Sequence, residues 1–401
     1  MKRNLDFVGL SFFILFLGNG LLHAEPSIEE EAKMNVSEII KSYGYPLEMH
    51  SVTTEDGYIL SLQRIPYGLK NTSTDSRPVV LLQHGLLDSS FTYVSNGPEK
   101  SLGFILADNG FDVWLSNSRG NIYSNSHIKY SKNEQEFWDF TWDEMAKYDL
   151  PSVINYALSV SQASKLGYVG HSQGGEIGFA KFSDNSGINS KVFGFVALAP
   201  AVFLGHMKSA LKYILLVSGG VNLVLNLIGN GEFIINDALL REMAQFVCKD
   251  KIVSQLCENV IFLLEGVDEK NFNLTRLPIY LAHLPAGTSS KNIHHYGQSY
   301  ISNEFQMYDH GLLKNLAVYN QATPPKYNLD TNGLPVAILY GGNDDLTDPV
   351  DIDRVADILK DNVKFKKLIP DYNHLDLVWA NDAYTRIFPD VVNFLYQYAG
   401  T

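Results

Sequence analysis

Short apolar runs alternate with longer amphipathic stretches along most of the chain. The runs are rich in Val, Ile, Leu and aromatic residues, which is typical of buried β-strands. They span residues 79–83, 111–115, 166–169, 192–198, 336–340 and 363–369. Helical periodicity marks residues 149–160, 174–182, 351–360 and 383–398. This alternation predicts an α/β fold with a mostly parallel central sheet and helices on both of its faces.

The regular alternation stops between residues 202 and 335. Inside this segment residues 211–228 are very apolar, but Lys212 and several Gly and Asn residues interrupt the run. These interruptions argue against a membrane span and favour a mainly helical cap or lid inserted into the fold. Such a cap would divide the core into residues 25–201 and 336–401. For any single leucine of the run, packing inside the cap is the alternative to contact with lipid.

Residues 1–24 have the features of a secretory signal peptide. Lys2 and Arg3 precede an apolar run over residues 7–17, and Ala24 offers a small residue for cleavage. The run is shorter than the roughly 20 residues of a membrane span. We therefore expect a protein of the secretory pathway, secreted or lysosomal, without a transmembrane anchor. An uncleaved anchor is the alternative.

The charge of the chain limits its partners. The formal net charge is −13 at pH 7. An acidic protein is poorly suited to bind nucleic acid through phosphates or to dock electrostatically on an anionic membrane. Any attachment to lipid should therefore be apolar. The sequence does not define an oligomeric state.

Cysteines and glycosylation sequons agree with export. Cys248 and Cys257 are the two cysteines of the chain, and an even count in an exported protein predicts one disulfide, with two free buried thiols as the alternative. Asn35, Asn71 and Asn273 each begin an Asn-x-Ser/Thr triplet and are candidate glycosylation sites.

The strongest chemical signal is Gly170-His171-Ser172-Gln173-Gly174. It follows the strand predicted at 166–169 and opens the helix predicted at 174–182. A G-x-S-x-G pattern in this setting indicates a nucleophile elbow, in which a tight turn exposes the serine above the sheet. We therefore predict an α/β-hydrolase fold with Ser172 as the nucleophile.

A serine nucleophile needs a base and an acid, which in this fold follow it in the order Ser, acid, His. Asp344 follows the strand predicted at 336–340 and is the expected acid, with Asp345 and Asp348 as alternatives. His374 follows the last predicted strand and is the expected base.

The same fold needs an oxyanion hole, the pair of N–H groups that stabilises the tetrahedral intermediate. One donor is the main-chain N–H after the nucleophile, that of Gln173. The other is expected in the segment Gln83-His84-Gly85-Leu86-Leu87, at the N–H of Leu86, with His84 holding the loop in shape.

No metal or cofactor is expected. The pair His294-His295 lacks a second cluster of ligands with zinc spacing. The chain also has no G-x-G-x-x-G motif or phosphate-binding loop.

Several long motifs, in order along almost the entire chain after residue 24, closely resemble the acid lipases, the animal family that includes gastric and lysosomal acid lipase. The motifs are Thr54-Glu-Asp-Gly-Tyr-Ile-Leu, Arg64-Ile-Pro-Tyr-Gly68, His84-Gly-Leu-Leu87, Asn117-Ser-Arg-Gly-Asn121, Asp143-Glu-Met-Ala-Lys-Tyr-Asp-Leu-Pro151, the Gly170 elbow and Tyr372-Asn-His-Leu-Asp376.

The resemblance implies a cap over Ser172 and hydrolysis of triacylglycerols, cholesteryl esters or both. It implies Ser172, Asp344 and His374 as the triad, Leu86 and Gln173 as oxyanion donors, and a disulfide between Cys248 and Cys257. The segment after Asp344 looks one residue longer than in gastric lipase, and the apolar lid residues differ.

Three functions are compatible with these residues. The first is a serine carboxylic-ester hydrolase that acts on lipid esters at a lipid–water interface. The second is a soluble carboxylesterase or acyltransferase with the same triad. The third is a catalytically inactive lipid-binding protein, which is disfavoured because every catalytic position is filled.

Overall fold

The computed structural model of the chain describes residues 25–70, 72, 76–184, 186–213, 215–216, 230–233 and 270–400. The predicted signal peptide, Asn71, both cysteines and most of residues 211–228 lie outside this part of the chain.

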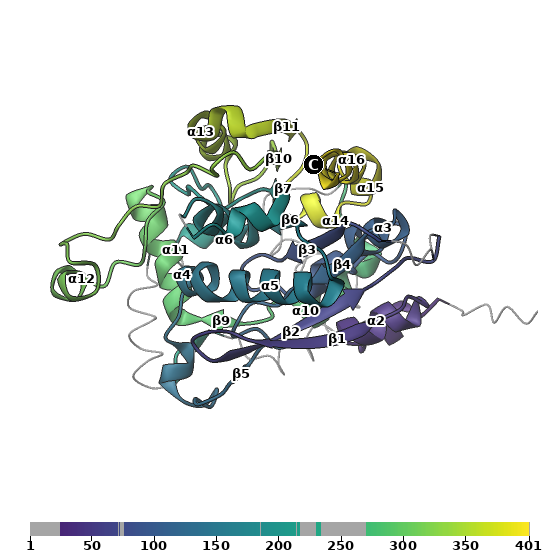
Figure 1. Cartoon of the computed structure of the whole chain (residues 1–401), viewed down its shortest axis with the longest axis horizontal. Helices are drawn as coiled ribbons and strands as arrows, with labels where there is room; N and C mark the ends of the chain where they lie inside the picture. Colours follow the sequence, from purple (N-terminus) through teal and green to yellow (C-terminus); the bar gives the residue numbers. More distant parts are fainter. Residues whose placement is uncertain are drawn as a thin grey trace, which may run out of the picture.

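A large mixed sheet forms the centre of the molecule (Figure 1). In the described part of the chain its main path runs β1-β2-β4-β3-β6-β7-β10-β11. The strands from β4 to β11 are parallel, whereas β2 is antiparallel to β1, β4 and the short β5. The bounds are β1 Glu48–Thr53, β2 Tyr58–Ile65, β3 Val79–Gln83, β4 Asp112–Leu115, β5 Ser126–His127, β6 Leu166–His171, β7 Val192–Leu198, β10 Val336–Gly341 and β11 Val363–Ile369.

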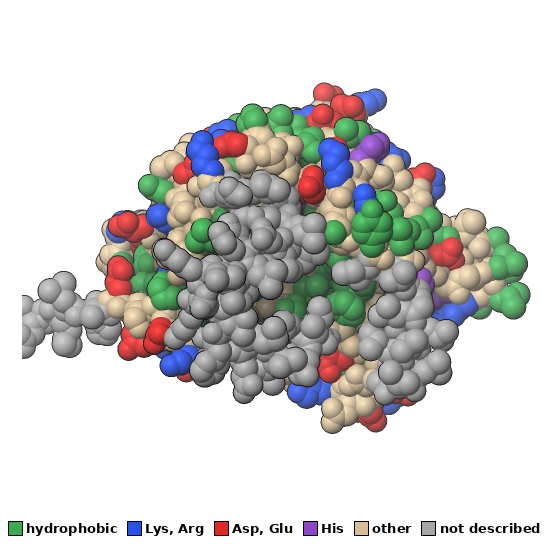
Figure 2. All heavy atoms as spheres, turned by 180° about the vertical axis from the view of Figure 1, so that it is seen from behind, with side chains coloured by type: hydrophobic (Ala, Val, Ile, Leu, Met, Phe, Trp, Pro, Cys, Tyr) green, Lys and Arg blue, Asp and Glu red, His purple; other side chains and the backbone are tan. Residues whose placement is uncertain are grey.

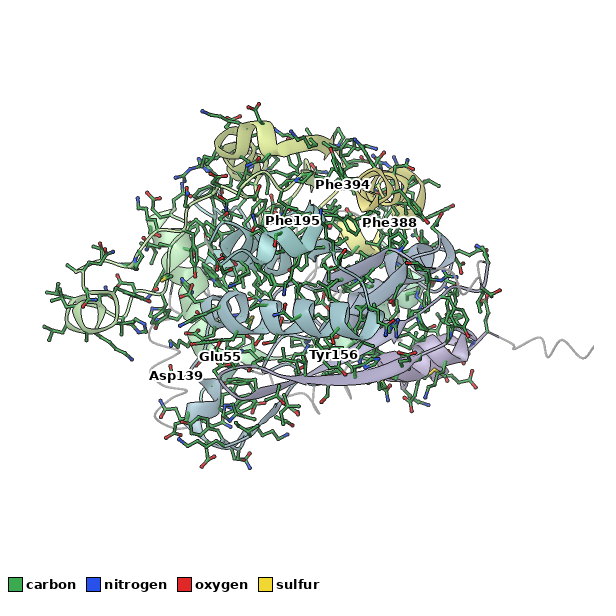
Figure 3. All side chains as sticks on the ribbon, in the orientation of Figure 1. Glu55, Asp139, Tyr156, Phe195, Phe388 and Phe394 are labelled. Carbon is green, nitrogen blue, oxygen red and sulfur yellow. The ribbon has the colours of Figure 1, made fainter. Side chains whose placement is uncertain are left out.

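Each central strand is buried on both faces because successive side chains point to opposite sides of the sheet. Leu81, Tyr168 and Phe195 pack into one apolar cluster, which includes side chains of α5 (Leu150–Ser161), α6 (Gln173–Phe182) and α13 (Pro349–Leu359). Their neighbours Leu82 and Val196 pack into a second cluster with α2 (Val36–Ser42), α3 (Leu102–Asp108), α14 (Asp376–Trp379) and α16 (Phe388–Ala399). Figure 3 labels Phe195 of the first cluster and Phe388 and Phe394 of the second.

The remaining short helices connect these layers. They are α1 Ile28–Glu31, η1 Ser90–Tyr93, η2 Gln135–Trp138, α4 Trp142–Glu144, the π-helix η3 Met145–Asp149, η4 Ile188–Lys191, η6 Lys360–Asn362 and α15 Ala383–Arg386.

The predicted α/β fold is confirmed, and all six predicted strands are present within a few residues. Some features differ. The strands β1, β2 and the two-residue β5 were not predicted. β1 is largely exposed and has no apolar run, and in β2 the apolar residues are interrupted by Ser61, Gln63 and Arg64. The helix predicted at 383–398 is two helices, α15 and α16, because Pro389 in the first turn of α16 lacks an N–H donor and cannot continue α15.

The segment between β7 and β10 carries the predicted insertion. Its described elements are β8 Glu232–Phe233, η5 Leu274–Arg276, α10 Leu277–His283, β9 Thr288–Ser289, α11 Ser290–Ser302 and α12 Leu312–Tyr319. The helix α10 packs on the core, where the ring of Tyr280 stacks on Trp379 with centroids 4.4 Å apart. The helix α12 projects from the body of the molecule (Figure 1). The division into core and cap domains stays a prediction.

Candidate active site

Ser172 occupies a strained turn between β6 and α6. Its backbone has φ 53° and ψ −117°, a conformation that costs a residue with a side chain about 1–3 kcal/mol. The flanking glycines permit the turn. A Cβ at Gly170 would lie 2.5 Å from Gly174, and a Cβ at Gly174 would lie 2.3 Å from the carbonyl oxygen of Gln83. The backbone therefore packs too closely here for any residue larger than glycine.

The turn is held in place by main-chain hydrogen bonds from neighbouring segments. The N–H of Ser172 donates to the carbonyl of Leu198 at the end of β7 at 2.9 Å, and its carbonyl accepts from the N–H groups of Glu176 and Ala201. Ser172 thus sits at the carboxyl end of the parallel strands, where ligands bind in open α/β sheets.

Asp344 and His374 meet at the same end of the sheet. Asp344 follows β10 and His374 follows the neighbouring strand β11. The Nδ1 atom of His374 lies 2.8 Å from Oδ2 of Asp344, and both side chains are buried. A carboxylate at this distance favours the tautomer with the proton on Nδ1, in which the lone pair of Nε2 can accept a proton.

The carboxylate of Asp344 is fixed by its own loop. Its Oδ1 accepts from the N–H groups of Leu346 and Thr347 at 2.9 and 2.8 Å. The hydroxyl of Thr347 donates to Oδ2 at 2.6 Å. Sequence reasoning did not single out Thr347, although its position three residues after the acid could have indicated such a contact.

The two other candidate acids have different environments. Asp345 is half-buried, and its carbonyl accepts from the N–H groups of Lys208 and Ser209. Asp348 caps α13, accepting from Val350 N at 2.9 Å, and its carboxylate forms an ion pair with Lys208. Among the three, the carboxylate hydrogen-bonded to His374 is that of Asp344.

His374 also lies beside the elbow. Its carbonyl oxygen is 3.1 Å from Nε2 of His171, the residue before Ser172, and the two imidazole rings are 4.9 Å apart. Burial lowers the pKa of His171 well below its usual range, so this ring is uncharged. The contact brings the loop of the predicted base to the turn of the predicted nucleophile.

The loop that contains Leu86 lies against Ser172. A Cβ at Gly85 would be 3.1 Å from Cβ and 3.6 Å from Oγ of Ser172. Leu86 follows this glycine directly, so its main-chain N–H belongs to the segment that faces Ser172. The N–H of Gln173 lies at the start of α6, where main-chain donors and the helix dipole favour negative charge.

His84 braces this loop from inside. Its Nδ1 lies 2.8 Å from the carbonyl of Gly85, and its Nε2 accepts from the N–H of Ser118 at 3.0 Å. Because Nε2 accepts, the proton is on Nδ1 and donates to Gly85. Burial lowers the pKa of His84 to about 4, which keeps the ring neutral. Arg119, the residue after Ser118, is itself buried between Asp56 and Asp149.

The chain matches known families over most of its length. A model described as "alpha/beta hydrolase fold" matches residues 78–381, and one described as "Partial alpha/beta-hydrolase lipase region" matches residues 36–97. Gastric triacylglycerol lipase of Bos taurus is 45% identical over 367 residues, which cover 91% of this chain and 92% of the relative. The chain belongs to the acid lipase family. Lysosomal acid lipase/cholesteryl ester hydrolase of Macaca fascicularis is 43% identical to this acid lipase, over 94% of the chain and 96% of the relative.

A solved structure supports the fold of this acid lipase. A soluble variant of monoglyceride lipase from Saccharomyces cerevisiae has a TM-score of 0.53 and 17% identity, over 88% of this chain and 98% of that one. At this identity the similarity concerns the fold alone.

The remaining predicted positions are distributed over the surface and the insertion. Asn35 is exposed at the start of α2, and Oδ1 of Asn273 accepts from the hydroxyl of Thr275 at 2.7 Å. Nδ1 of His294 lies 2.9 Å from the Tyr308 hydroxyl, and Nε2 of His295 lies 3.0 Å from the Gln306 carbonyl.

No helix in the described ranges is both long and apolar enough to cross a bilayer.

Proposed function

We propose that this acid lipase hydrolyses carboxylic esters of lipids, namely triacylglycerols, cholesteryl esters or both. The contact of His374 with Asp344 at the carboxyl end of the sheet, next to the Ser172 elbow, is the observation that carries the proposal. Relatives named for triacylglycerol and cholesteryl ester hydrolysis, similar over more than nine-tenths of their length, support the substrate class.

The geometry supports an acyl-enzyme mechanism. Nε2 of His374 takes the proton of the Ser172 hydroxyl as Oγ attacks the ester carbonyl, and Asp344 stabilises the imidazolium that forms. The N–H groups of Leu86 and Gln173 donate to the oxyanion of the tetrahedral intermediate. The imidazolium then protonates the leaving alkoxide, and a water activated by the same histidine releases the fatty acid.

The helix α12 supports contact with a lipid surface. Its buried polar residue is Asn315, which donates to Asp309 Oδ1 at 2.7 Å and to the Ala322 carbonyl at 3.0 Å. Its leucines point outward, with Leu312, Leu313 and Leu316 exposed to 60, 83 and 47%. Figure 2 shows hydrophobic side chains at the outer tip of this projection, on the right edge of the molecule.

The low charge of α12 and its flanking residues favours contact of its exposed leucines with a lipid surface. Residues 311–321 contain one charged side chain, Lys314, and no acidic one, although the protein as a whole is acidic. A lipid surface under hydrolysis accumulates fatty acid carboxylates, which complement a lysine and do not repel this tip.

We expect emulsified long-chain triacylglycerol to be hydrolysed faster than a dissolved short-chain ester. Replacing both Leu313 and Leu316 by Gln should weaken adsorption of the protein to the emulsion by about tenfold, because two apolar side chains no longer leave water there. The rate on the dissolved ester should not change. Adsorption is measured by flotation, and hydrolysis by titration of released fatty acid.

Ile358→Gln provides the control, because Ile358 is also exposed but lies on α13. If only the dissolved ester is cleaved, the protein is a soluble carboxylesterase. If the variant with Gln at positions 313 and 316 and the Ile358→Gln control both adsorb like the wild type, α12 has no role at the lipid surface.

We further propose that the protein enters the secretory pathway and is secreted or lysosomal. Three features of the sequence support this route: the predicted signal peptide over residues 1–24, the three sequons, and the predicted pair of Cys248 with Cys257. Of the sequon asparagines, Asn35 is exposed in the structure. Mass spectrometry of the exported protein should find residues 1–24 absent, glycans at Asn35, Asn71 or Asn273, and a disulfide joining the two cysteines. Two free thiols or an intact N-terminus would contradict these assignments.

A further inference from the structure

The side chain of Gln173 is held by the inserted segment. Its Oε1 accepts from Asn292 Nδ2 at 2.8 Å and lies 3.3 Å from the hydroxyl oxygen of Tyr296, and both of these residues are on α11. Its Nε2 donates to the sulfur of Met145 at 3.5 Å. All four side chains lie in the interior, so hydrogen bonds from two other elements, α11 and η3, hold the side chain of Gln173.

The Tyr296 hydroxyl has a second, closer partner. Its oxygen is 2.5 Å from Oε2 of Glu176, a fully buried carboxyl on α6. The other carboxyl oxygen, Oε1, is buried without a hydrogen-bond partner in the described part of the chain. A tyrosine hydroxyl carries one hydrogen, so it cannot donate to Glu176 and Gln173 at the same time.

The surroundings of Glu176 favour the protonated form of both its carboxyl group and the Tyr296 hydroxyl. Burial raises the pKa of Glu176 well above its usual range; the bond to Tyr296 opposes this rise and the nearby Asp143 adds to it. Asp143 on α4 is engaged by Tyr327 Oη and the Tyr308 N–H. The helix α6 packs against β6, β7, α4, α5, η3 and η4. The described Lys and His residues of these elements have other partners: His171 contacts the His374 carbonyl, Lys147 lies over the Tyr148 ring, and Lys191 donates to Asn155. Burial also raises the pKa of Tyr296, which keeps its proton.

A neutral Glu176 gives every hydrogen a partner. Its hydroxyl on Oε2 donates to the Tyr296 oxygen, and the Tyr296 hydroxyl is then free to donate to Gln173 Oε1. The unpartnered Oε1 of Glu176 becomes a neutral carbonyl oxygen, which costs far less to bury than a carboxylate oxygen. If Glu176 were ionised, the Tyr296 hydroxyl would turn toward the carboxylate and Gln173 would lose one of its two donors.

We infer that an uncharged Glu176 and Tyr296, together with Asn292, are positioning residues that fix Gln173 and thereby orient its main-chain N–H toward the oxyanion. The inference rests on the proposed function, because it assigns the network to the same oxyanion hole. It also links α11 of the inserted segment to the turn that carries the nucleophile.

The test compares Tyr296→Phe with Tyr300→Phe on a dissolved short-chain ester. Both changes remove one hydroxyl from α11, but the Gln173 contact is made by Tyr296. Tyr296→Phe should lower kcat roughly tenfold with KM unchanged, because the hydrogen bonds of an oxyanion hole strengthen in the transition state. Tyr300→Phe should change neither constant. Equal kcat in the two variants would overturn the network.

The protonation state of Glu176 is tested by two substitutions at this position. Glu176→Gln keeps an uncharged donor and cannot ionise, so it should lose less kcat at neutral pH than Glu176→Leu, which removes the donor. A Glu176→Gln variant that loses as much kcat as Glu176→Leu would overturn the neutral acid. The proposed function is judged separately, because it fails only if the wild type cleaves no ester or Ser172→Ala retains the activity.

Discussion

Ser172→Ala is expected to lower kcat for ester hydrolysis by roughly 10⁶-fold, to a residual rate supplied by substrate binding and the oxyanion hole. The expectation follows from the position of Ser172 at the strained turn, with the His374 loop against the preceding residue. The measurement is kcat on emulsified triacylglycerol and on a dissolved ester, since loss of the nucleophile must abolish both.

The serine exchange has a matched control. Ser186→Ala removes a hydroxyl from an exposed loop and should leave kcat within about twofold of the wild type. The thermal unfolding midpoint of Ser172→Ala should remain close to that of the wild type, because alanine keeps the Cβ that the turn already accommodates. Substantial hydrolysis by a folded Ser172→Ala protein would show that another residue attacks the ester.

Asp344→Asn is expected to lower kcat by about 10⁴-fold with little change in KM. An amide at this position can donate to Nδ1 of His374, which would favour the tautomer with its proton on Nε2 and leave Ser172 without a base. The same change removes the charge that stabilises the imidazolium in the transition state. Steady-state kinetics on the dissolved ester measure the effect without interference from adsorption.

Asp345→Asn is the matched comparison, because it makes the same chemical change one residue away. The structure gives Asp345 no contact with His374, so we expect kcat within about threefold of the wild type. A large loss in Asp345→Asn together with a small loss in Asp344→Asn would reverse the assignment of the acid.

Local sequence was sufficient for the core of the fold and for the tight turn that carries Ser172, the predicted nucleophile. The strands β3, β6, β7 and β10 are apolar on both faces because helices cover both sides of the sheet, so each appears as a continuous apolar run. The Ser172 turn is likewise local, because the close approach of Gly170 and Gly174 to the backbone can be inferred from the glycines themselves.

Contacts between distant segments were decided only by the tertiary structure. Adjacent residues Asp344 and Asp345 are chemically alike, and only the packing of the loop after β10 directs one carboxylate to His374. Gln173 and its partner Asn292 are 119 positions apart, so no local pattern could pair them. The sequence determined the elements and the residue types of the site because these depend on short-range periodicity and turn geometry. The tertiary structure decided which side chains meet, because each of those contacts joins residues that are far apart in the sequence and close only in the folded chain.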